Sequence, residues 1–177
     1  MRLPVLALAT VLATPFAASA QMAPAPAPAP ACAAMDKDIP AELAGWTDKA
    51  ALSAATSAAG LSKAALVPGK AYLATLAPTP DVAYTVQPEK PGGTVSKGGL
   101  FSLTIDKAGA YVIALGSGAW IDVLKDGAGA RSTAHGRGPA CTTLRKMVTF
   151  DLQPGRYVVQ ISANAEASLP IMVAAKP

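Results

Sequence analysis

The sequence predicts an all-β protein, an antiparallel β-sandwich of jelly-roll type with a short alanine-rich helix or loop before it. Two observations predict this class. Apolar and polar residues alternate in several short runs after residue 70, and segments rich in proline and glycine separate these runs. Long helical segments do not lie between the runs, which argues against a parallel sheet with crossover helices.

About eight strands follow from the alternation. Their inward-facing residues are Tyr72, Ala74 and Leu76; Val82, Tyr84 and Val86; Phe101, Leu103 and Ile105; Tyr111, Ile113 and Leu115; Ile121 and Val123; Val148, Phe150 and Leu152; Tyr157, Val159 and Ile161; and Leu169, Ile171 and Val173. Residues 126 to 143 are predicted to form a long polar loop. The segment 153 to 156, Gln-Pro-Gly-Arg, fits a type II turn.

The segment before these strands, residues 36 to 66, is rich in alanine. Thr47 is predicted to cap a short helix beginning at Asp48. Few large apolar residues recur at helical spacing, and Gly60 interrupts the pattern. A short helix or an ordered loop is therefore expected. Trp46 is expected to plug the edge of the core.

The N-terminus is typical of an exported protein. Residues 1 to 20 combine Arg2, a short apolar stretch and the cleavage pattern Ala18-Ser19-Ala20, and they are predicted to be a signal peptide. The apolar stretch is too short to be a membrane anchor, and no transmembrane segment is predicted. Residues 21 to 31 are predicted to be an Ala-Pro linker and 32 to 177 a β-sandwich domain, located in the periplasm or secreted.

Two cysteines remain, Cys32 and Cys141. An even pair in an exported chain most simply forms a disulfide bond. The two positions are 109 residues apart, and the loop-entropy model gives about 4 to 5 kcal/mol for a bond that closes such a loop. The alternative is a reactive thiol or a thiolate metal ligand at Cys141.

One segment contains the candidate binding residues of the chain, the basic segment 131 to 146. It contains Arg131, His135, Arg137, Arg145 and Lys146 and no acidic residue. Its glycines allow backbone N–H groups to approach a ligand closely. These five residues are predicted to bind a carboxylate, phosphate or sulfate group, on a small anionic molecule, an envelope glycan or a protein partner.

A structural interpretation of the same segment stays open. Arg145 and Lys146 can protect a strand edge against aggregation, Arg131 can be solvated, and His135 can bond a backbone carbonyl. A third interpretation makes His135 and Cys141 metal ligands, although two ligands are too few for a closed site. Asp106, Asp122, Asp126 and Asp151 are interpreted as solvated surface residues.

Composition limits the function classes further. The formal net charge is +4, only 5% of the residues are aromatic, and the chain has a single histidine. A single histidine excludes metal sites built from several histidines. The aromatic residues do not interleave with the basic segment, which argues against binding of single-stranded nucleic acid. No cofactor is predicted, and no catalytic triad or phosphate-binding loop is found.

Two resemblances extend this reading. The run GGLFSLTIDKAGAYVIALGSGAWIDVLKDGAGARS with VTFDLQPGRYVVQIS resembles the bacterial pre-peptidase C-terminal domain. That resemblance implies a jelly-roll-like accessory or binding module without catalytic residues. The segments CAAMDKDIPAELAGW, PEKPGG, AWIDV and HGRGPACTTLRKMVTFDL are similar to small exported alphaproteobacterial proteins. Some of these proteins carry the label homogentisate 1,2-dioxygenase, whose iron takes two histidines and a carboxylate.

Three hypotheses follow for the function. The first is a non-enzymatic periplasmic β-sandwich that binds a ligand or partner through residues 131 to 146. The second is a metal-dependent oxygenase or redox enzyme that uses His135 with carboxylates; the single histidine argues against it. The third is a purely structural envelope protein.

Overall fold

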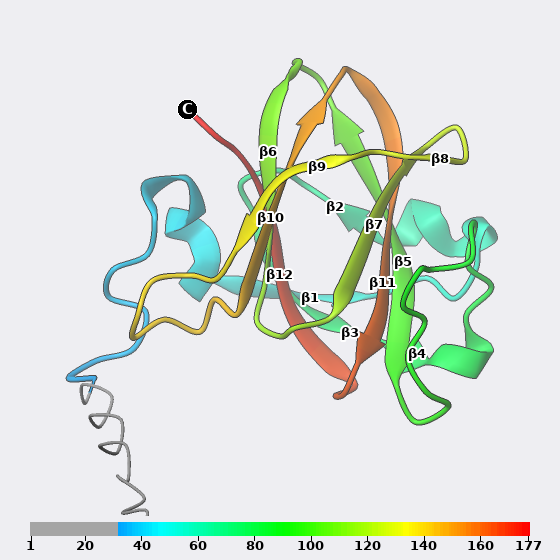
Figure 1. Ribbon diagram of the computed structural model, residues 1–177, viewed down its shortest axis with the longest axis horizontal. Coiled ribbons are helices and arrows are strands. Elements are labelled where there is room, and N and C mark those ends of the chain that lie inside the picture. Colours follow the sequence, from blue (N-terminus) through cyan, green and yellow to red (C-terminus); the bar gives the residue numbers. More distant parts are fainter. Residues whose placement is uncertain (1–31) are drawn as a thin grey trace, which may run out of the picture. The chain divides into compact units, whose positions relative to one another are not determined.

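The structure is a computed structural model, and it describes residues 32 to 177. The predicted signal peptide and Ala-Pro linker lie outside the described residues. Two β-sheets face each other (Figure 1). The inner faces of both sheets supply the main core. The all-β sandwich predicted from the alternation is confirmed.

The first sheet, here sheet A, has the strand order β1-β3-β12-β6-β10-β9. Its strands are β1 (Lys49–Ser53), β3 (Ala71–Thr75), β12 (Ser168–Ala175), β6 (Gly109–Leu115), β10 (Lys146–Leu152) and β9 (Ser132–Gly136). Within it only the β1–β3 pair is parallel.

The second sheet, sheet B, has the order β2-β5-β11-β7-β8, with β4 also paired to β5. Its strands are β2 (Ala65–Leu66), β5 (Lys97–Ile105), β11 (Gly155–Asn164), β7 (Trp120–Lys125), β8 (Ala128–Gly129) and β4 (Ala77–Pro78). The β2–β5 pair is parallel, so both sheets are antiparallel except at one edge. From β5 onward most connections cross between the sheets, as in a jelly roll.

The predicted strands coincide with observed strands except for one run. Val82, Tyr84 and Val86 form no strand; their segment follows the short 3-10 helix η3 (Thr79–Asp81). Side chains of sheet B hold this segment instead. The Gln160 amide accepts hydrogen bonds from the backbone N–H groups of Thr85 and Val86 (2.7 and 3.2 Å) and donates one to the Val86 carbonyl (2.9 Å). Residues 85 to 90 therefore lie as a strap on the outer face of sheet B.

The alanine-rich N-terminal part forms two 3-10 helices, η1 (Ala41–Thr47) and η2 (Ala58–Lys63), with β1 between them. The prediction of a helix beginning at Asp48 is wrong, because η1 ends at Thr47 and β1 follows at Lys49. Trp46 lies in a second apolar cluster and not at the edge of the main core. It is fully buried there against the outer face of sheet A, with Leu43, Met172 and Leu144 among its neighbours.

Candidate functional site

The predicted polar loop 126 to 143 contains ordered strands. Asp126 and Gly127, with φ angles of 52° and 79°, make the tight turn between β7 and β8. Such Asp-Gly turns match the twist of a two-residue hairpin loop. The chain then crosses to sheet A and forms β9, which pairs with β10 (Figure 1). A register shift opposite Thr149 and Phe150 marks the place where β9 turns away toward sheet B.

This crossing leaves a pocket of about 630 Å³ on the flank of the sandwich. Strand β8 pairs only with Leu124 and Lys125, so the edge of β7 at residues 120 to 123 faces the crossing segment 129 to 132. We call this space the flank pocket. Volumes of this size are typical of small-ligand sites.

The flank pocket collects three of the five basic-segment residues predicted as the site. Arg131 stands at the crossing segment, His135 on β9 and Lys146 at the start of β10. They line one pocket because β9 folds back along β10, which pairs His135 with Val148, two residues after Lys146, and Ser132 with Phe150. Arg131 and His135 are exposed and Lys146 is half-buried.

Two lysine side chains contact the ring of Trp120 on β7 at the opening of the flank pocket, which we call its rim. The Lys90 and Lys146 ammonium nitrogens lie 4.9 and 5.2 Å from the centre of its ring, distances at which a cation interacts with an aromatic ring. Lys146 Nζ also donates a hydrogen bond to the Ala119 carbonyl (2.7 Å). Lys90 is held by the strap, whose Lys90 carbonyl accepts a bond from the Ser162 hydroxyl (2.8 Å).

The rim also contains a carboxylate whose burial was not predicted. Asp122 was expected to be solvated, but it is half-buried, and its Oδ2 is buried with no hydrogen-bond partner among residues 32 to 177. Its Oδ1 accepts a bond from the Trp120 indole N–H (2.9 Å). Burial raises the pKa of Asp122, and the bond from Trp120 opposes that rise. Glu89 of the strap, which also lines the pocket, raises the Asp122 pKa further.

The pKa of Lys146 is shifted in the opposite direction, downward. Burial lowers its pKa, and the nearby charge of Lys90 lowers it further, whereas Asp122 favours the charged form. Two ammonium groups thus share one indole ring beside a single half-buried carboxylate. An anion placed at this rim reduces the repulsion between the two lysines.

Arg137 and Arg145 are not part of this group. They line a separate hollow of about 400 Å³, formed by the turn between β9 and β10. The sequence could not separate the two sets, because the distance between them depends on the path of the chain after β9. Predicted as one patch, the five residues occupy two pockets.

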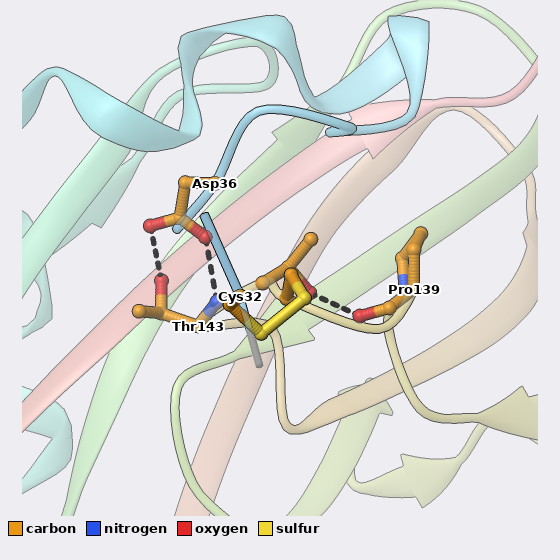
Figure 2. The surroundings of a disulfide bond; sticks show 6 residues. Cys32, Asp36, Pro139 and Thr143 are labelled. Atoms are coloured by element: carbon orange, nitrogen blue, oxygen red, sulfur yellow. Dashed lines mark hydrogen bonds between the residues drawn. A yellow bond between two sulfur atoms is a disulfide. The ribbon is translucent and has the colours of Figure 1, made fainter. Parts of the chain in front are cut away.

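Cys141, which lines this second hollow, forms a disulfide bond. Cys32 and Cys141 are joined, as the cysteine count predicts, and no free cysteine remains among the described residues (Figure 2). The alternative of a reactive thiol or a thiolate ligand at Cys141 is therefore wrong. Asp36 supports the bond: its Oδ1 and Oδ2 accept hydrogen bonds from the N–H (2.6 Å) and hydroxyl (2.7 Å) of Thr143.

No family model matches the chain, and a search of curated proteins finds no match either. The iron that the oxygenase label would require can be tested against the residues themselves. In the part of the chain that the structure describes, no three or more His, Cys, Asp or Glu side chains come together as a metal site. The described residues therefore do not fit an iron held by two histidines and a carboxylate.

Between residues 32 and 177, no helix has the length and apolar character needed to cross a bilayer.

Proposed function

We propose that the protein is an exported, non-enzymatic binding protein of the periplasm or the secreted fraction, and that it holds a small anionic ligand in the flank pocket. The observation that carries this proposal is the gathering of Arg131, His135 and Lys146 around one pocket, with Lys90 and Lys146 over the same indole. Arginine and lysine are the usual partners of carboxylate and phosphate groups.

The disulfide bond and the predicted signal peptide support the assignment to an oxidising compartment. The resemblance to a pre-peptidase C-terminal domain agrees with a binding role, since that domain serves as an accessory module. Anionic small molecules are favoured over a protein partner because the cations surround a concave space of ligand size.

Titration of the ¹⁵N-labelled, disulfide-bonded protein with acetate, glucuronate, phosphate and sulfate tests the proposal. We expect saturable chemical-shift changes at Trp120, Arg131, His135 and Lys146 for at least one of these probes. The Arg131→Ala variant should weaken binding about tenfold or more, because a charge-assisted hydrogen bond contributes about 1.5 to 3 kcal/mol.

Arg137→Ala is the matched control. It removes the same charge from the same basic segment, but Arg137 lines the other hollow. It should leave the affinity unchanged at physiological ionic strength. Equal weakening by both variants, or resonances that none of the anions shifts, would contradict binding in the flank pocket.

A further inference from the structure

The bottom of the flank pocket differs in character from its rim. Ile121 and Val123 of β7 and Val148 and Phe150 of β10 line it, and these side chains are only 7, 1, 7 and 3% exposed. They belong to the main core between the sheets. The pocket thus opens from a charged rim onto carbon atoms contributed by both sheets.

The crossing segment forms the wall that keeps this space. Ala130 N–H donates a hydrogen bond to the Val123 carbonyl (2.7 Å), which fastens the segment to the edge of β7. Ala130 is half-buried and packs against the core, but its side chain is a single methyl group. A small residue at this position leaves room between β7 and β10.

The charges around the rim limit the ligand to a weakly charged one. Lys90, Arg131 and Lys146 are opposed by Glu89 and Asp122, so three cations face two carboxylates. One net positive charge matches a monoanion. A dianion such as a phosphate monoester would be repelled by the two carboxylates as well as attracted by the cations.

We infer that the ligand is an amphiphilic monocarboxylate, a molecule with one carboxylate at the cationic rim of the flank pocket and an unbranched or compact hydrocarbon part between the two sheets. This inference rests on the proposed function and specifies its ligand class. An acidic sugar fits the bottom of the pocket less well, because its hydroxyl groups would lose hydrogen bonds to water against Ile121, Val148 and Phe150.

A chain-length series tests the inference by calorimetry and by chemical shifts. The probes are butanoate, hexanoate and octanoate. Two controls separate the parts of the ligand: 1-octanol has the hydrocarbon chain but no charge, and glucuronate has the carboxylate but no hydrocarbon chain. Each buried methylene contributes up to about fourfold in affinity. We expect octanoate to bind at least tenfold more tightly than butanoate, and to shift the methyl resonances of Ile121, Val123 and Val148.

Two alanines two positions apart provide matched variants. Ala130→Leu places a larger side chain on the pocket wall, and it should weaken octanoate binding tenfold or more while butanoate binding changes little. Ala128→Leu adds the same group on the exposed strand β8 and should change neither. If Ala130→Leu does not fold, the methyl shifts of the unchanged protein still decide the question.

The outcomes separate the two proposals. Equal affinities along the chain-length series, or glucuronate binding more tightly than octanoate, would overturn the amphiphile while leaving anion binding in place. Octanol binding as tightly as octanoate, with no loss in Arg131→Ala, would instead contradict the anionic ligand of the proposed function. Length-dependent binding of the carboxylates that needs Arg131 supports both.

Discussion

At the scale of single residues, Lys146 shows how the fold sets the chemistry of the pocket. Its position at the start of β10 brings its ammonium group beside the Trp120 ring, which the Lys90 ammonium group also contacts. Burial and Lys90 both disfavour its charge, and Asp122 favours it. Each of these influences comes from a different element, so each can be removed separately.

The pKa of Lys146 is therefore expected to move in opposite directions in two variants. Lys90→Gln removes a like charge and should raise the Lys146 pKa toward its usual value of 10.5, whereas Asp122→Asn should lower it further. A ¹³Cε NMR titration measures both. Because the folded-state pKa lies below the unfolded value, stability gained from Lys146 should increase as the pH rises through the folded-state pKa toward 10.5. Shifts in the same direction in both variants would contradict this arrangement.

Residue types were predicted better than residue neighbours. Arg131, His135 and Lys146 were predicted as site residues because a cluster of basic residues is visible in the sequence, and all three line the flank pocket. Asp122 was missed because its outward position on an alternating strand is typical of a solvated residue. The strap that covers it comes from residues more than 30 positions away, and no local pattern shows that contact.

At the scale of elements, the strands with strict alternation were predicted closely, and the irregular ones were not. The Asp126-Gly127 turn is a strong hairpin signal, but β8 has only two residues and β9 is exposed along its whole length. Neither strand carries buried alternation. Conversely, Val82 and Tyr84 contact the core although their segment forms no strand. Their alternate positions in the sequence resemble the pattern of a strand.

Two tyrosines close the connections between strands of opposite sheets. The Tyr157 hydroxyl donates to the Gln153 carbonyl (2.8 Å) and accepts from its N–H (3.0 Å), and the Tyr111 hydroxyl donates to the Lys107 carbonyl (2.9 Å). Each tyrosine thus bonds the backbone four residues before it, at the start of a strand, as in the tyrosine corner of β-sandwiches.

Replacing Tyr157 by phenylalanine is expected to lower the free energy of unfolding by about 1 kcal/mol, because Gln153 is exposed and water partly replaces the lost bonds. Urea denaturation measures the change. The control is Tyr72→Phe: Tyr72 is equally buried, at 5% exposed, but no hydrogen bond of its hydroxyl is found within residues 32 to 177. A loss of the same size in both variants would mean that the hydroxyl bonds at Gln153 contribute nothing specific.

At the scale of the whole domain, the two flanks of the sandwich are built differently. The N-terminal part supplies an edge strand to each sheet, β1 beside β3 and β2 beside β5, and these are the parallel pairs. At the other ends of the sheets, β8 and β9 are joined by the crossing segment beside the flank pocket. Alternation predicts which residues face inward but not strand direction or order, so this asymmetry could not be predicted.

The disulfide bond and the Asp36–Thr143 hydrogen bonds fasten the N-terminal segment to the turn after β9 (Figure 2). The Thr143 hydroxyl also accepts a bond from the buried Trp46 indole (2.8 Å), which continues this attachment into the second apolar cluster. The non-covalent contacts can therefore hold the folded segment when the covalent bond is absent. The bond itself acts mainly on the unfolded chain, where it closes a loop of 109 residues.

Replacement of Cys32 and Cys141 by alanine is expected to lower the free energy of unfolding by about 4 to 5 kcal/mol, the loop-entropy value for this separation. The chemical shifts of β5, β6 and β7 should stay unchanged, because the folded sheets do not depend on the bond. Guanidinium denaturation measures the loss, and the unmodified protein under full reduction should unfold at the same midpoint as the variant. A loss below about 1 kcal/mol would contradict the prediction, because the bond would then not restrict the unfolded chain as the loop-entropy model requires.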